Sequence, residues 1–263
     1  MDFSEKRILG RTGVAVSRLG LAGGYGVPAA AVEKAFYEHG VNYFYWSTPR
    51  RPGMGEGLRS LVKNNREEII IVLQSYDHLG LTVKRSVRKG LKVLGIDYAD
   101  VVLLGLHNWK PSRKVIEGAL KLKESGMVRF IAMSGHNRKL FGKIAQQSDS
   151  PFDIFMVRYN AVHPGAEDDI FPYLSDENRP GITTYTATRW GALLKHKKMP
   201  PGEEPLTASD CYRFVLSNPH VDLCMMGSAS LREMEEGISA LEKGPLSDEE
   251  IERARRIGNF IHG

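Results

Sequence analysis

Side chains that could carry acid–base chemistry stand at the ends of several short apolar runs of the chain. Tyr45, Gln74 and His107 end or follow three of these runs. A phenol or an imidazole can donate or accept a proton, and an amide can orient either group through a hydrogen bond. Carboxylates are nearly absent from the ends of the runs. The sequence therefore argues against a hydrolase with paired carboxylates and against a site for a hard metal ion.

The histidines, cysteines and serines show no spacing typical of a metal site or an activated nucleophile. His107, His136 and His163 fall in three separate loops, without a His-x-His or His-x-x-Glu-His pattern. No Gly-x-Ser-x-Gly elbow occurs, and Cys224 lies within an apolar run. We therefore expect no bound metal and a buried, inert Cys224.

A turn rich in glycine and serine indicates a second kind of site. Gly227-Ser228-Ala229-Ser230 lies between an apolar run and a helical pattern. Backbone N–H groups at the start of a helix can hold a phosphate, and loops late in a barrel often do so. A plain tight turn is the alternative, and the pattern alone does not decide between the two.

The chain has 263 residues and a formal net charge of +5, with its basic residues scattered and often beside acidic ones. Because neither a basic tail nor a nucleic-acid motif occurs, we expect an anionic small molecule rather than nucleic acid as the partner. A solvated basic surface is the alternative explanation. No run of about 18 apolar residues predicts a membrane span, and no signal-peptide pattern opens the chain. With two cysteines, a cytoplasmic protein is the simplest interpretation.

Apolar runs and helical patterns alternate along the whole chain. Eight such units in about 250 residues favour a closed barrel over an open sheet, and a hairpin is expected beneath it at 7–17. The sequence predicts an α/β fold, a TIM (β/α)8-barrel with an N-terminal β-hairpin, in which residues 1–263 form a single domain. The predicted strands are 18–23, 42–46, 68–74, 100–104, 128–134, 153–157, 181–186 and 221–226; the predicted helices are 29–39, 54–64, 80–94, 112–125, 137–147, 167–175, 207–217, 231–242 and one from 247.

Several segments, taken in order, resemble the aldo-keto reductase family of bacteria. Residues 9–20 are similar to its N-terminal hairpin and first strand, and residues 100–107 to its fourth strand with the active-site histidine. Residues 128–134 and 152–160 are similar to its fifth and sixth strands, and 226–236 to the loop and helix that hold the adenosine phosphate of a nicotinamide cofactor. The resemblance implies a barrel and an NADP(H)-dependent oxidoreductase.

The resemblance also implies a catalytic tetrad of Asp, Tyr, Lys and His, of which this chain keeps His107. Tyr45 stands at the Asp position, Arg50 at or near the Tyr position and Gln74 at the Lys position. The family's Lys lowers the pKa of its Tyr, because a neighbouring cation favours the ionised phenol. Without that cation, we expect Tyr45 to donate the proton and Arg50 to recognise an anionic group of the substrate. The alternative is that Tyr45 only packs the barrel mouth.

Tyr45 and His107 are expected to face each other across the mouth of the barrel. They end the second and fourth strands, so one strand lies between them. Two strand spacings amount to about 10 Å, which two long side chains can bridge. Gln74, at the end of the intervening strand, is expected to hydrogen-bond to one of them.

The cofactor positions that the resemblance implies are partly kept. Ser134 would hold the carboxamide and Tyr185 would stack on the nicotinamide, whereas Gly135 and Met156 replace an Asn and a Gln of the family. The phosphates and the adenosine are assigned to Gly227, Ser228, Arg232 and Glu236.

Three functions stay open at this point. The first, which we favour, is an oxidoreductase that uses NADPH, or NADH, on a small carbonyl or alcohol substrate. The second is a barrel enzyme without redox chemistry, such as a lyase or isomerase acting on an acidic substrate. The third is a catalytically silent protein that keeps the cofactor. The sequence does not name the substrate, the preferred nucleotide or the oligomeric state.

Overall fold

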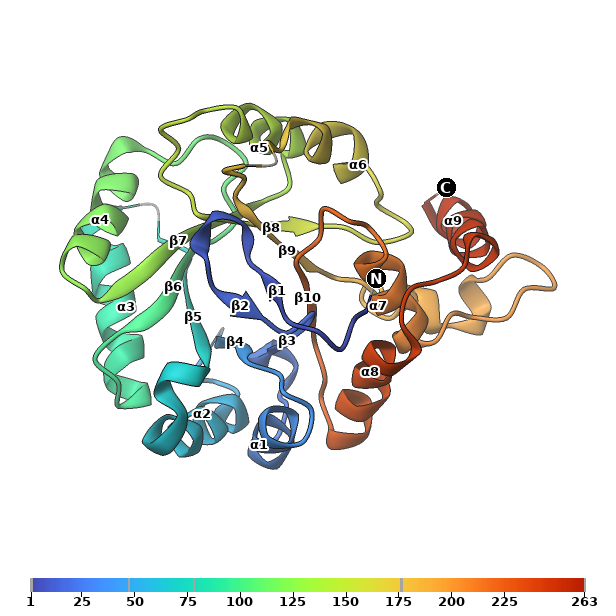
Figure 1. The fold of residues 1–263 in the computed structure, drawn as a ribbon, viewed down its shortest axis with the longest axis horizontal. Coiled ribbons are helices and arrows are strands. Elements are labelled where there is room, and N and C mark those ends of the chain that lie inside the picture. Colours follow the sequence, from blue (N-terminus) through green and yellow to red (C-terminus); the bar gives the residue numbers. More distant parts are fainter. Residues whose placement is uncertain (1, 47, 78, 176, 263) are drawn as a thin grey trace.

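The computed structural model describes residues 2–46, 48–77, 79–175 and 177–262. Eight parallel strands close into a barrel that the helices surround (Figure 1), which confirms the predicted (β/α)8 fold. Each strand pairs with the next along the chain, and the last pairs with the first. In barrel order the strands are β3 (Leu19–Ala22), β4 (Tyr43–Trp46), β5 (Ile70–Ser75), β6 (Ala99–Leu104), β7 (Val128–Gly135), β8 (Ile154–Arg158), β9 (Gly181–Tyr185) and β10 (Leu223–Met226).

Side chains of each strand alternate between the barrel interior and the layer under the helices. In β4, Tyr43 and Tyr45 pack in the interior cluster, whereas Phe44 and Trp46 belong to the outer cluster. Because the barrel ends in one mouth at the carboxyl ends of the strands, the last inward side chain of each strand faces that mouth. The position of a residue in its strand therefore decides whether it can reach a ligand there.

The helices between the strands begin where side chains satisfy their first free N–H groups. Ser112 accepts a hydrogen bond from Val115 N, and Asn137 accepts one from Leu140 N. The helices are α1 (Ala29–Tyr37), α2 (Pro52–Asn65), α3 (Gly80–Leu94), α4 (Arg113–Glu124), α5 (Arg138–Ala145), α6 (Ala166–Asp169), α7 (Ala208–Leu216), α8 (Leu231–Lys243) and α9 (Asp248–His262). Within the described ranges, none of them combines the length and the apolar character needed to cross a membrane.

The N-terminal hairpin covers the end of the barrel opposite the mouth. β1 (Arg7–Ile8) pairs antiparallel with β2 (Ala15–Val16). Between them, Arg11 N donates to the carbonyl of Arg179, just before β9 begins. Leu9 is buried in the interior cluster of the barrel. The predicted hairpin is confirmed, and it leaves the carboxyl ends of the strands open to a ligand.

One predicted helix is wrong in its extent. The sequence suggested a helix over 167–175, but α6 ends at Asp169 and a short 3-10 turn follows over Phe171–Tyr173. Pro172 explains the break, because proline offers no N–H to a helix and disfavours helical backbone at the residue before it. The last helix begins as its capping box predicts: Glu250 N donates to Ser247 Oγ over 3.2 Å, and Ser247 N donates to Glu250 Oε2 over 2.8 Å.

Candidate active site

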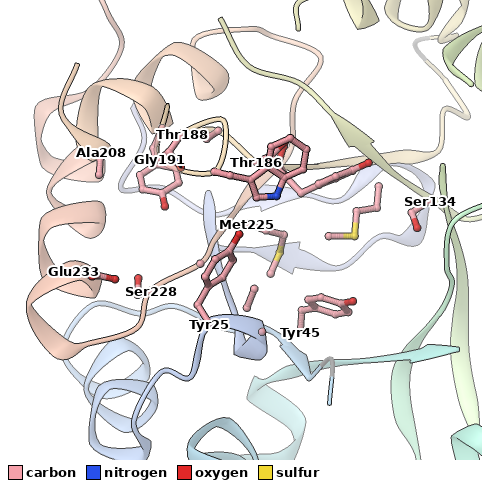
Figure 2. A pocket seen from close by; sticks show the side chains of 18 of the residues that line it. Tyr25, Tyr45, Ser134, Thr186, Thr188, Gly191, Ala208, Met225, Ser228 and Glu233 are labelled. Atoms are coloured by element: carbon pink, nitrogen blue, oxygen red, sulfur yellow. The ribbon is translucent and has the colours of Figure 1, made fainter. Parts of the chain in front are cut away.

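A cavity of about 750 Å³ opens at the mouth of the barrel. It is elongated: Ser134 and Tyr45 lie toward one end, and Ser228 and Glu233 lie at the other, beside the start of α8 (Figure 2). Met225 lies between the two ends. Its volume falls in the range of ligand pockets in proteins, about 300–1,000 Å³.

The last inward side chains of the barrel strands form a ring around the mouth, and five of them are polar. Three of these polar side chains are Tyr45 in β4, Gln74 in β5 and Ser134 in β7. Arg158 in β8 and Tyr185 in β9 complete the five, since they share the inward phase of Met156 and Thr183. Arg158 is the only member of this ring that carries a charge at neutral pH.

Tyr45 combines a half-buried ring with a hydroxyl at the cavity. Burial raises the pKa of Tyr45, and its hydrogen bond and proximity to Tyr76 raise that pKa further. Neither cause involves a cation. The phenol of Tyr45 therefore stays protonated at any pH at which the protein would normally work.

Gln74 and His107 flank Tyr45 in different ways. Gln74 lines the cavity, and its buried Oε1 accepts no hydrogen bond from the residues that the structure describes. His107 is 5% exposed and does not line the cavity, and its backbone N–H donates to Ser134 O over 2.7 Å. Tyr45 lies in β4 and His107 follows β6, and the strand order confirms that one strand, β5, lies between these two. Of the two, only Gln74 meets a ligand directly in this arrangement.

Ser134 is held at the end of β7 by the loop after β6. Leu106 N donates to Ser134 Oγ over 3.2 Å, and Leu106 adopts a positive φ of 59° to do so. Because the serine oxygen acts as the acceptor in this bond, its own O–H can donate to a carbonyl oxygen in the cavity.

The loop after β9 is shaped by unusual backbone conformations. Thr186, Arg189 and Trp190 have φ values of 61°, 53° and 53°, in the left-handed region that such residues rarely adopt. Asn160, which is fully buried, fixes the loop by donating from Nδ2 to Thr186 O over 2.8 Å. Strained backbone of this kind often occurs at ligand sites. Thr186, Thr188 and Trp190 all line the cavity.

The glycine and serine turn after β10 forms the far end of the cavity. Gly227 and Ser228 both line it, and a Cβ at Gly227 would lie 2.7 Å from the ring of Tyr25. Ser230 caps α8 by accepting from Glu233 N over 3.2 Å. Ala229 N donates to the Glu233 carboxylate over 2.8 Å. The backbone donors of this turn are thus already partly used by the chain's own side chains.

Seven of the ten site residues expected from the sequence line this one cavity. His107, Arg50 and Arg232 do not line it; Arg50 and Arg232 are exposed. The seven residues are Tyr45, Gln74, Ser134, Tyr185, Gly227, Ser228 and Glu236.

The residues that line the cavity without having been expected from the sequence include two tyrosines and a glutamate. Tyr25 and Tyr76 come from the loops after β3 and β5, and Glu233 comes from the first turn of α8. The rule that selects residues after strand ends would have found both tyrosines. Among the described residues, no group of three His, Cys, Asp or Glu side chains is arranged to hold a metal ion.

Comparison with known proteins agrees with this architecture. An aldo-keto reductase from Bacillus halodurans in its holo form superposes with a TM-score of 0.77 at 20% identity, covering 96% of each chain. An aldo-keto reductase from Klebsiella pneumoniae, solved in complex with NADPH, gives a TM-score of 0.74 at 19% identity and covers 97% of this chain and 95% of its own. At such identities, these similarities establish the fold alone. No curated protein matches the chain.

The family assignment rests on the sequence model of the aldo/keto reductase family. That model matches residues 28–210, which run from the start of α1 into α7 and include six of the eight barrel strands. The closed barrel, the hairpin beneath it and the cavity at its mouth fit the same assignment. This chain belongs to the aldo/keto reductase family.

Proposed function

We propose that this protein is an NADP(H)-dependent oxidoreductase that acts on a small carbonyl or alcohol substrate. The observation that carries the proposal is the elongated cavity, in which Ser134 and Tyr45 lie apart from Ser228 and Glu233. A dinucleotide needs a site of this kind, with one end for the ring that reacts and another for the phosphates and adenosine. The nucleotide supplies a hydride at the reacting end when it is bound.

The residues at the reacting end fit a nicotinamide ring. The Ser134 hydroxyl is oriented by Leu106 N and is able to donate to a carboxamide oxygen. Tyr185 presents a half-buried aromatic ring at the same end of the strands. These are the two functions that such a ring requires: a polar anchor and a flat apolar face.

The phosphate end fits less well. The turn at Gly227 and Ser228 offers backbone N–H groups at the start of α8. Glu233 and Glu236 line the cavity there, however, and Glu233 holds Ala229 N. We propose that Glu233 releases this amide when a phosphate binds, which weakens the binding of NADPH more than that of NADH.

Tyr45 is the proposed proton donor. Its O–H would protonate the carbonyl oxygen while hydride is added to the carbonyl carbon. Gln74, whose amide oxygen has no hydrogen-bond donor among the described residues, would orient the tyrosine or the substrate. In this account, the usual Asp, Tyr and Lys of the family are replaced by Tyr45, Arg50 and Gln74. Because no cation lowers the pKa of Tyr45, turnover is expected to be slow.

A catalytically silent, cofactor-binding protein is the second candidate. The observation that favours it is the burial of Tyr45 beside Tyr76, with no cation among the described residues to lower its pKa. In both candidates, residues 1–263 act as one domain, because β10 pairs with β3 and the barrel needs both ends of the chain. The buried, unpaired thiols of Cys211 and Cys224 suit a cytoplasmic protein.

One experiment separates the candidates. The protein is incubated with NADPH and a panel of aldehydes and ketones, and oxidation of NADPH is followed by absorbance. The oxidoreductase proposal expects slow turnover of at least one carbonyl compound. Binding of NADPH without turnover of any compound would favour the silent protein.

A further inference from the structure

Three neighbouring strands align His136, Arg158 and Tyr185 at the mouth of the barrel. In the parallel pairing of β7 with β8, Gly135 is the partner of Val157, so His136 is level with Arg158. In the pairing of β8 with β9, Arg158 is the partner of Tyr185. The alternation of side chains gives Arg158 the inward phase of Met156. Met156 and His136 line the cavity, and Arg158, which does not line it itself, is close enough to act on the pKa of His136. An arginine therefore stands beside the ring proposed to stack on the nicotinamide.

Arg158 has no acidic partner. Among the residues that the structure describes, it forms no hydrogen bond and no ion pair, and the charged groups that act on it are the cations Arg138 and Arg189. Asp169, a carboxylate near this cluster, is already held by Arg138 over 2.9 Å. A half-buried guanidinium among like charges is an unfavourable arrangement unless an anion completes it.

The side chains of Arg189 and His136, beside Arg158, also offer hydrogen-bond donors to the site. Arg189 lies with its guanidinium 5.0 Å from the Trp190 ring centroid, and its buried Nε donates to no acceptor in the described part of the chain. His136 lines the cavity, and burial together with the charge of Arg158 lowers the pKa of His136. A neutral imidazole still offers one N–H donor. The cluster thus presents donors and positive charge without any carboxylate to receive them.

We propose that Arg158, with His136 and Arg189 beside it, binds an anionic group of the substrate, so that the protein acts on carboxylate-bearing carbonyl compounds. This inference rests on the proposed oxidoreductase function, because it places the carboxylate next to the reacting end of the cavity. The planar guanidinium matches a carboxylate with two parallel hydrogen bonds. Arg50, which the sequence assigned to this task, is exposed, whereas Arg158 is half-buried and level with His136, which lines the cavity.

Cofactor phosphates are the other possible source of the anion. The turn and helix suited to phosphates, at Ser228 and Glu233, lie at the opposite end of the cavity from Ser134 (Figure 2). Ser134 ends β7, the strand that His136 follows. The anion bound by Arg158 is therefore expected to come from the substrate.

The test compares benzoate with benzamide, its neutral analogue, in calorimetric titrations of the full-length protein without a nucleotide. Benzoate is expected to bind at least about tenfold more tightly than benzamide, as hydrogen bonds to a charged group provide. Arg158→Gln should remove this preference, and Arg158→Lys should keep part of it. The matched control is Arg113→Gln, since Arg113 is exposed on α4 and pairs with Glu117. Arg189→Gln provides a second variant, with a smaller expected loss, in case Arg158→Gln does not fold.

Two results would overturn the inference. One is equal binding of benzoate and benzamide by the unmodified protein, or a preference that survives Arg158→Gln. The other is a loss of NADPH affinity in Arg158→Gln of about tenfold or more, which would assign the cluster to the cofactor. Because the first titration needs no nucleotide, its outcome is independent of whether the protein is an oxidoreductase. Failure of the proposed function would instead appear as an absence of NADPH binding by the unmodified protein.

Discussion

The two sides of the barrel mouth differ in the side chains that they present to the cavity. On the side of β7, β9 and β10, Ser134, Tyr185 and Gly227 stand where a nicotinamide nucleotide would need a hydroxyl, a ring and a turn. On the side of β4 and β5, Tyr45 and Gln74 carry no charge, and the tyrosine packs against the apolar interior of the barrel. In the proposed function, the residues that bind the nucleotide and the residue that moves the proton lie on separate strands, so that one set could change without the other.

Electrostatics sharpens the contrast. Around Tyr45 the neighbours that act on its pKa are tyrosines, and burial is the largest cause of the increase. Around Tyr185, burial also raises the pKa, but Arg158 opposes that increase. Of these two tyrosines, the one proposed to stack on the cofactor therefore has a cation acting on its pKa, and the one proposed to donate a proton has none among the described residues.

The largest expected effect is on proton transfer. Tyr45→Phe removes the proposed donor, so turnover of a carbonyl substrate should fall about 10²-fold, as loss of a general acid does. The affinity for NADPH should not change, because the two functions lie on different strands. Steady-state kinetics and a fluorescence titration of the same variant measure both quantities.

The control for this change is Tyr37→Phe. Tyr37 is exposed on α1 and donates no proton to the cavity. Equal turnover by Tyr45→Phe and Tyr37→Phe would show that Tyr45 does not move the proton.

A smaller effect is expected on the binding side. Ser134→Ala removes the proposed hydrogen bond to the carboxamide, so the dissociation constant of NADPH should rise about fivefold, the worth of a neutral hydrogen bond. The half-buried Ser239, whose hydroxyl donates to Glu236 O within α8, provides the control Ser239→Ala. If the two variants bind NADPH alike in a fluorescence titration, Ser134 does not anchor the nucleotide.

Glu233→Gln should improve nucleotide binding slightly. Removing this carboxylate frees Ala229 N and lowers the repulsion of a phosphate, so NADPH should bind about threefold more tightly, the usual size of an exposed charge interaction. NADH should gain less, because it lacks the additional phosphate. Glu235→Gln is the matched control, since Glu235 lies on the same helix but pairs with Lys34. An unchanged ratio of NADPH to NADH affinity would contradict this view of the phosphate end.

The smallest effect concerns pH. Burial and Tyr76 raise the pKa of Tyr45 above the ordinary tyrosine value of about 10. A donor must be protonated, so activity should stay level as pH rises through the range in which an ordinary tyrosine ionises. A pH profile of kcat that falls with an apparent pKa near or below about 10 would mean that another group, or a less buried Tyr45, donates the proton.

The barrel could be predicted from the sequence because apolar runs and helical patterns alternate regularly. The same reasoning located most of the cavity, since residues after strand ends meet at one face. This reasoning did not identify which side chains of the following loops and helices face the cavity. Arg50 and Arg232 follow strand ends within a few residues, but they point to solvent, and sequence spacing does not reveal the direction of a loop or helix side chain.

Arg158 illustrates the opposite error. It ends β8 in the inward phase, which alternation from Met156 would have revealed. Its lack of a carboxylate partner depends on the third dimension, because Asp169 is paired with Arg138 from another helix. The extent of α6 was missed for a local reason, the break at Pro172.

Every role proposed for the cavity at the barrel mouth depends on its binding a nicotinamide nucleotide. The most direct measurement is a fluorescence titration of the unmodified protein, at micromolar concentration, with NADPH and in parallel with NADH. A saturable response to NADPH below about 1 mM is expected, and the additional phosphate of NADPH should add less to the affinity than membership of the family alone implies. No response to either nucleotide at millimolar concentration would contradict it.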